Sequence, residues 1–266
     1  MQQPRSKFLK PCNFAGMQEV HFYDLGSMGY REAWDFQERL LAANTAKKLL
    51  AGTRVHAQVL PAGEAIRVDA GATTIHHLLF VEHPPVFTLG KSGKAEHILL
   101  SPADLAGKQV DYFPTNRGGD ITFHGPGQLV VYPILDLERF YTDIGRYLRN
   151  LEEVVIRTLA AYGLKGERSA GETGVWLDAA VTGRERKICA IGVRCSRWVT
   201  MHGFALNVNT DLDYFGYIIP CGIRGKGVTS MARELGYCVP MADVKQRVKH
   251  YFEEVFGVFL VDASPL

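Results

Sequence analysis

The sequence predicts an α+β fold in which helices pack against a mixed β-sheet. The 266 residues are 47% hydrophobic and 22% charged, which is ordinary for a soluble globular protein. Strand-like apolar runs outnumber the helical segments, and the helices fall in blocks rather than after every strand, which disfavours a doubly wound sheet. We expect a flexible N-terminal arm over residues 1–18 and a single domain over residues 19–266.

Three segments carry the three-and-four spacing that is typical of amphipathic helices. The first covers residues 31–50, with Gly52 as its stop. The strongest pattern covers residues 143–162 and ends before Gly163, and the third covers residues 243–256. The recurring positions are Trp34, Leu40, Leu41 and Leu49 in the first, Ile144, Tyr147, Leu148, Leu151, Val154, Val155, Thr158, Leu159 and Tyr162 in the second, and Val244, Val248, Tyr251, Phe252 and Val255 in the third.

Short apolar runs between these helices predict the strands of the sheet. Residues 53–75 mix β-branched residues with Gly and Pro, which fits a hairpin or an ordered excursion. The glycine-dense residues 117–128 are expected to form a loop that leads into a buried strand. The predicted strands cover residues 78–81, 86–90, 129–134, 174–177, 188–193 and 203–208.

Composition excludes several classes of protein. A net charge of +2 gives no reason to expect nucleic acid as a partner. No apolar stretch approaches the ~20 residues that cross a bilayer, so no membrane is expected. The N-terminus lacks the apolar core of a secretory signal, which predicts a cytoplasmic protein, with organellar targeting by the basic residues 1–18 as the alternative.

Five scattered cysteines form no CxxC pair and no regular framework, which predicts free thiols in a reducing compartment and no zinc site. Cys189 and Cys195 lie in and beside an apolar run, so we expect both to be buried as small hydrophobic residues. Cys221 differs, because it lies in the Pro/Gly turn of residues 220–223. A thiol on exposed backbone is chemically useful only if it ionises easily.

Lys187 could supply the partner that Cys221 needs. A free thiol has a pKa of roughly 8.5 and a free ammonium roughly 10.4, so each group placed beside the other stabilises its charged form. Such a pair supports acyl transfer through a thioester. Spacing alone does not bring the two together, and Lys187 also ends the charge run of residues 184–187, which fits a solvated hairpin tip.

The glycine-dense run of residues 117–128 is neither a P-loop nor a dinucleotide-binding fingerprint, because both spacings are missing. It fits a structural double turn, or a wall of the acyl pocket with Arg117 and His124 as polar anchors at its mouth. A single histidine is more often structural than catalytic, which leaves His124 a weak candidate for a base.

Taken together, these segments resemble the lipoyl(octanoyl) transferase family from about Tyr30 to Leu235. Each motif is weak alone, but their shared order is highly specific. The matching motifs are Tyr30, Trp34 and Gln37, then residues 82–90, 117–128, 174–176, the Lys187 segment, 202–207 and 220–223. Three departures are an unusually long connection at residues 50–75, an additional N-terminal arm, and Cys189 in place of a small alanine.

The resemblance implies a fold like that of biotin and lipoate protein ligases, which is class II synthetase-like. It also implies Cys221 as the nucleophile that carries the acyl group and Lys187 as the residue that lowers the pKa of this thiol. The substrate-binding residues that it implies are Arg117, Gly118, Gly119, Asp120, Ile121, Thr122, Phe123, His124, Ala190, Ile191, Gly192, Gly203, Phe204 and Ala205.

The activity that the resemblance implies is transfer of an octanoyl group from octanoyl-acyl carrier protein to a lysine of a lipoyl domain, the first step of protein lipoylation. Acceptors would be E2 subunits of 2-oxoacid dehydrogenases and the glycine cleavage H protein. No cofactor is expected, neither ATP nor a metal, since phosphopantetheine enters with the substrate, and the enzyme is expected to be a monomer. The alternatives are an ATP-dependent lipoate or biotin ligase, a non-catalytic protein that binds lipoyl domains, and a hydrolase that uses Cys221 with His124 or His202.

Overall fold

A large mixed sheet organises the computed structural model, which describes residues 17–52, 73–219 and 226–264. Within these ranges no helix is long and apolar enough to cross a membrane. The strands follow one another across the sheet as β12 (Val258–Asp262), β1 (Gln18–Ser27), β2 (His76–Glu82), β6 (Gln128–Ile134), β10 (Val199–Asn207), β9 (Arg186–Ser196), β8 (Glu172–Leu177) and β7 (Glu167–Ser169), and β11 (Gly227–Val228) pairs with β9.

The pairing confirms the predicted mixed sheet. β1 runs parallel to both β12 and β2, and β11 runs parallel to β9. The remaining pairs, from β2 through β6, β10, β9 and β8 to β7, are antiparallel. Neither terminal strand, β1 nor β12, is among the strands that the apolar runs predict.

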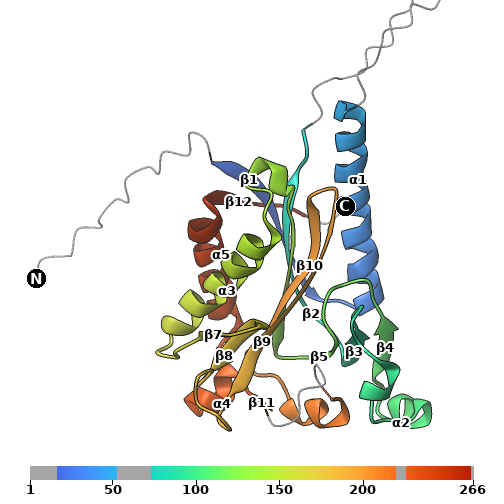
Figure 1. Cartoon of the computed structure of the whole chain (residues 1–266), viewed down its shortest axis with the longest axis vertical. Helices are drawn as coiled ribbons and strands as arrows, with labels where there is room; N and C mark the ends of the chain where they lie inside the picture. The colour runs from blue at the N-terminus through green and yellow to red at the C-terminus, as the bar shows by residue number, and fades with distance from the viewer. Residues whose placement is uncertain (1–16, 53–72, 220–225, 265–266) are drawn as a thin grey trace, which may run out of the picture.

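Helices cover both faces of this sheet, with α1 (Tyr30–Gly52) on one side and α3 (Ile144–Ala160) and α5 (Met241–Phe256) on the other (Figure 1). Alternation along β2 explains this arrangement. Leu78 and Phe80 join the core under α3 and α5, whereas Leu79 and Val81 join the core under α1. The three helices therefore confirm the helical spacing, although Leu49 near the end of α1 is 49% exposed rather than part of its packed face.

A second, three-stranded sheet stands beside the large one, in the order β4 (Asp111–Pro114), β3 (Val86–Leu89) and β5 (Ile121–His124). β5 lies inside the glycine-dense run, so the prediction of a loop there was wrong for these four residues. The short alternation of Ile121 and Phe123 buries both side chains in a small core with Phe87 and Ile218, and this burial makes the segment a strand.

Short helices complete the described chain: α2 (Pro102–Gly107), α4 (Met231–Leu235) and the 3₁₀ turns η1 (Ala95–His97), η2 (Leu137–Arg139) and η3 (Leu212–Tyr217). Residues 53–72 lie outside the described ranges, and with them most of the expected hairpin or excursion at 53–75. The same holds for residues 1–16 of the expected N-terminal arm.

Candidate active site

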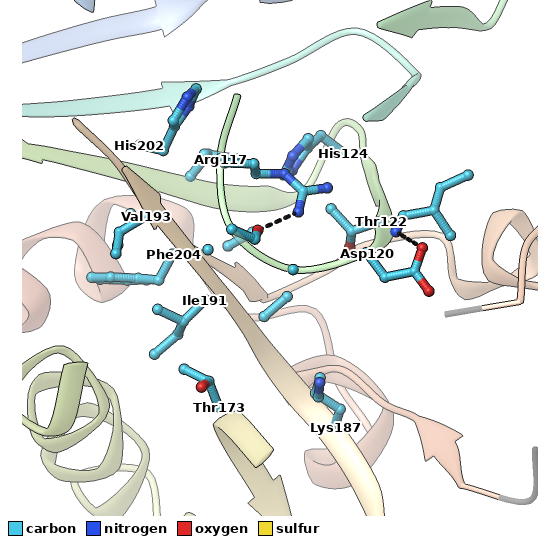
Figure 2. Close-up of a pocket in the computed structure, with 18 of the residues that line it drawn as sticks. Arg117, Asp120, Thr122, His124, Thr173, Lys187, Ile191, Val193, His202 and Phe204 are labelled. Carbon is cyan, nitrogen blue, oxygen red and sulfur yellow. Dashed lines mark hydrogen bonds between the residues drawn. The ribbon is translucent and has the colours of Figure 1, made fainter. Parts of the chain in front are cut away.

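One cavity of about 460 Å³ is walled by the glycine-dense loop, the edge of β5, strands β9 and β10, and the start of α3 (Figure 2). The residues that line it are Tyr30, Arg117, Gly118, Gly119, Asp120, Ile121, Thr122, His124, Gln128, Val130, Tyr132, Ile144, Leu148, Glu172, Thr173, Lys187, Ala190, Ile191, Gly192, Val193, His202, Gly203, Phe204, Ala205, Asn207, Phe215 and Val228. Lys187 and all but one of the fourteen implied substrate-binding positions are among them.

Backbone hydrogen bonds hold the glycine loop against β9. The amide of Gly118 donates to the carbonyl of Val193 at 2.9 Å, and Gly119 adopts a left-handed conformation with φ of 84°. A Cβ atom at Gly192 would lie only 2.6 Å from the carbonyl oxygen of Gly118. Glycine at position 192 therefore permits the close approach that forms this wall of the cavity.

Arg117 ties the same loop to the small sheet. Its Nη2 donates to the carbonyl of Thr88 at 2.5 Å and to the hydroxyl of Thr88 at 2.9 Å, and its Nη1 donates to the carbonyl of Gly118 at 3.0 Å. Asp120 bonds to the ring of His97 at 2.7 Å and accepts from the amide of Ile121 at 2.6 Å. The sequence suggested Arg117 as an anchor at the mouth, and the structure buries it as a fixed part of the wall.

The two candidate histidine bases are buried in hydrogen-bond networks. His124 Nδ1 donates to Gln128 at 2.7 Å, and burial holds the pKa of His124 well below its usual range. The Nδ2 of Asn116 donates a hydrogen bond to Glu38. The Oδ1 of Asn116 therefore accepts a hydrogen bond from Nε2 of His202 at 2.7 Å. Burial, with Arg117 nearby, lowers the pKa of His202 to about 3. Both rings are neutral at physiological pH, and both are weak bases.

Lys187 reaches the cavity from β9, beside Trp176 on β8, with which it is in register. Its Nζ atom lies 4.5 Å from the centre of the Trp176 ring, within the range of a cation–π interaction. Gly174 on the same strand has φ of 120°, and a Cβ atom there would lie 2.6 Å from the carbonyl oxygen of Cys189. Close packing of β8 on β9 therefore fixes the strand that carries Lys187.

Cys221, the implied nucleophile, lies outside the described residues. Phe215 and Val228, which flank its segment in the sequence, both line the cavity that Lys187 lines. Cys189 is fully buried, as expected, and burial raises the pKa of its thiol. Cys195 is only half-buried rather than buried, and burial raises the pKa of this thiol as well. Neither site favours a thiolate.

Phe123 is the implied substrate-binding residue that does not line the cavity. It faces the core of the small sheet, where its ring stacks on Tyr214 with centroids 4.5 Å apart. Strand alternation explains this, because its neighbours Thr122 and His124 are among the lining residues. Glu172 and Thr173 also line the cavity, although no sequence motif pointed to them, and Ile144 and Leu148 line it from a helix whose spacing predicted only core packing. The spacing of the last two on the helix places them one turn apart, but only the fold shows what they face.

Among the described residues, no group of three or more His, Cys, Asp or Glu side chains is placed to hold a metal ion. The polar groups that line the cavity are the Lys187 amine, the Arg117 guanidinium, two carboxylates, two neutral imidazoles, hydroxyl and amide side chains, and backbone amides. A largely apolar lining with a few polar groups at fixed places is typical of a site for a small or extended organic ligand.

Solved structures with a similar arrangement are lipoate-protein ligases. One is the bipartite lipoate protein ligase of Thermoplasma acidophilum, with a TM-score of 0.64, 17% identity and coverage of 94% of this chain and 88% of that one. Another is a lipoate-protein ligase A solved with ATP, with a TM-score of 0.64, 15% identity and coverage of 94% and 90%. At these identities the likeness defines the fold, which confirms the α+β class.

The family follows from the sequence comparisons. The family model of the lipoyl protein ligase A/B catalytic domain matches residues 29–253. An octanoyltransferase of Christiangramia forsetii is 52% identical to this chain, and the match covers 90% of this chain and 96% of the relative. An octanoyltransferase of Flavobacterium johnsoniae is 51% identical, and the match covers 92% of this chain and 99% of the relative. The chain belongs to the octanoyltransferases of the lipoyl protein ligase A/B family, and it is an acyltransferase.

Proposed function

We propose that this enzyme moves an octanoyl group from octanoyl-acyl carrier protein to the ε-amine of a lysine on a lipoyl domain, through a thioester on Cys221. The identity of about half of all residues to octanoyltransferases, over nine-tenths of the chain, carries this proposal. The lipoyl domain as acceptor is supported by the archaeal ligase of the same fold, which was studied with its E2 lipoyl domain.

In the first half-reaction the sulfur of Cys221 attacks the thioester carbonyl of the carrier. A C–S bond to Cys221 forms, and the C–S bond to the phosphopantetheine arm breaks. Lys187 takes the thiol proton and returns it to the departing thiolate. One thioester replaces another, so the exchange is nearly isoenergetic and needs no ATP. The second half-reaction forms an amide, which is more stable than a thioester and draws the transfer forward.

The apolar part of the cavity suits the acyl chain. Ile191, Val193 and Phe204 on β9 and β10, together with Ile144 and Leu148 on α3, offer hydrocarbon surface. Each buried CH₂ group contributes about 0.8 kcal/mol, so eight carbons give several kcal/mol with which to select chain length. Backbone amides of the glycine loop are candidates for binding the oxyanion of the tetrahedral intermediate.

An assay without ATP tests the proposal. The enzyme is mixed with octanoyl-acyl carrier protein and a lipoyl domain, and the mass of the lipoyl domain is followed. We expect octanoylation by the wild type, none by Cys221→Ala, and strongly slowed transfer by Lys187→Met. Replacing the exposed Cys238 with Ser is the matched control and should leave the rate unchanged. A strict need for ATP and free octanoate would instead identify a ligase.

Hydrolysis is a further alternative, and the burial of both candidate histidines disfavours it. A Cys/His hydrolase needs an imidazole that accepts a proton near neutral pH. The pKa of His202 is lowered to about 3 and that of His124 lies well below its usual range, in both cases chiefly because of burial. Release of free octanoate at the rate of transfer, with no acceptor present, would contradict our proposal.

A further inference from the structure

The charges around the cavity are unevenly distributed. Among the described lining residues the full charges are Arg117, Lys187, Asp120 and Glu172. Asp120 is committed to His97 and to the amide of Ile121. Lys226 adds a further ammonium group beside the cavity, 4.9 Å from the centre of the Trp176 ring. Glu172 is therefore the lining carboxylate that remains to balance the ammonium groups of Lys187 and Lys226 near Trp176.

Glu172 lies at the start of β8, four residues before Trp176, and its carboxylate has two unequal oxygens. Oε1 forms an ion pair with the Nζ of Lys226. Oε2 is buried and has no hydrogen-bond partner within the described chain. A buried carboxylate oxygen without a donor is costly, so the site favours an additional N–H group at this position. The side chain as a whole remains 21% exposed, and Glu172 lines the same cavity as Lys187.

The acceptor lysine brings such a group. It arrives in water as an ammonium ion, and it must enter a region where the Nζ of Lys187 and the Nζ of Lys226 already lie near one tryptophan ring. Repulsion between like charges in a partly dry pocket opposes this entry. The incoming group must also lose a proton before its nitrogen can attack a thioester. A carboxylate in the cavity wall meets both needs.

We propose that Glu172 is the subsite for the primary ammonium of the acceptor lysine and its proton acceptor; this inference rests on the proposed function. The ammonium donates a hydrogen bond to Oε2 and then transfers that proton to the carboxylate. The freed amine attacks the acyl carbonyl, the C–N bond forms, and the C–S bond to Cys221 breaks. The second nitrogen proton passes to the departing thiolate, and the carboxylic acid returns its proton to water.

Single-turnover measurements of the full-length enzyme separate the two half-reactions. The first step is acylation by octanoyl-acyl carrier protein, and the second is deacylation by a lipoyl domain or by hydroxylamine, which is uncharged near neutral pH. For Glu172→Gln we expect unchanged acylation, unchanged cleavage by hydroxylamine, and transfer to the lysine that is slower by about 100-fold, in the range of a lost general base. Glu172→Asp should recover part of the lost rate.

Two further variants serve as controls. Glu167→Gln removes a carboxylate from the neighbouring strand β7, away from the cavity, and should transfer at the wild-type rate. Lys226→Gln breaks the ion pair but keeps the carboxylate, and it should not slow transfer to the lysine. Equal slowing of both nucleophiles in Glu172→Gln, no slowing of either, or an equal effect of Lys226→Gln would overturn the inference. A wild type that forms no acyl-enzyme would instead overturn the proposed function.

Discussion

At the scale of single residues, the aromatic ring under Lys187 is the contact with the clearest consequence for chemistry. Trp176 is 2% exposed, and the ammonium groups of Lys187 and Lys226 lie 4.5 and 4.9 Å from its centre. A cation–π interaction contributes about 0.5–2 kcal/mol, more when the partners are shielded from water. If Lys187 acts as we propose, Trp176 is a positioning residue, because it contacts the lysine amine and does not itself line the cavity.

We predict that the acylation rate falls in the order wild type, Trp176→Phe, Trp176→Leu. Both variants lose buried area, so both should unfold at a lower temperature. Only the leucine variant loses the aromatic face, which should slow acylation by a further factor of about two to thirty. Stopped-flow acylation across pH 6–9 measures this. Equal rates and equal pH profiles for the two variants would contradict the positioning role.

The sequence predicted most of the residues that line the cavity, but it did not predict which way each side chain points. The family resemblance implied Gly118, Gly119 and Gly192 as substrate-binding positions, and the structure shows that Gly192 lets the glycine loop approach β9 closely. Phe123 and Arg117 stand in the same motif, yet one faces the core of the small sheet and the other is fixed within the loop. Which side of a short strand faces a ligand depends on pairing with distant strands, which local sequence does not encode.

At the scale of elements, the contact between the glycine loop and β9 forms the wall that closes the cavity. A methyl group at Gly192 would meet the carbonyl of Gly118 at 2.6 Å and Cδ of Arg117 at 3.3 Å. Because the carbonyl belongs to backbone that is itself hydrogen-bonded to Val193, the loop must move to relieve the contact.

We predict that Gly192→Ala destabilises the fold by about 1–3 kcal/mol, as overpacking does, and slows acylation because the loop is displaced. Gly107→Ala is the matched control, since no atom lies within 4 Å of a Cβ at that position and its φ is not left-handed. Thermal unfolding and single-turnover acylation measure the two effects. A Gly192→Ala variant that acylates at the wild-type rate would refute the role of this contact.

Local sequence patterns predicted the long helices but not all of the strands. Apolar spacing predicted α1, α3 and α5 because each buries one stripe against the sheet. It did not predict β1 and β12, which pair in parallel although they lie at opposite ends of the chain. Their partners are remote, and each strand is only partly buried, so neither stands out as an apolar run.

At the scale of the whole molecule, several histidines are buried in uncharged form. Burial, the largest cause in each case, lowers the pKa values of His76, His77 and His83 to about 4 and that of His202 to about 3. In the unfolded chain these rings take up protons below about pH 6.5, whereas the native protein does not. Stability is therefore fully present above pH 6.5 and is lost as the pH falls toward 4.

We predict that each such histidine removes about 2 kcal/mol from the free energy of unfolding between pH 6.5 and pH 5. Urea unfolding at pH 5, 6 and 7 measures the loss. In His76→Gln the free energy of unfolding should depend less steeply on pH, because about one proton fewer is taken up on unfolding. A wild type equally stable at pH 5 and pH 7 would show that these rings are protonated in the native protein.

We propose that the sulfur of Cys221 carries the octanoyl group, and this can be checked by locating the group on the enzyme. The enzyme is incubated with octanoyl-acyl carrier protein without ATP, digested at acidic pH, and its peptides are mapped by mass. We expect a single octanoyl group, labile to hydroxylamine, on the peptide that carries Cys221, and a much slower gain of that group in Lys187→Met. An octanoyl group on Cys189 or Cys195, or no adduct until ATP is added, would contradict it.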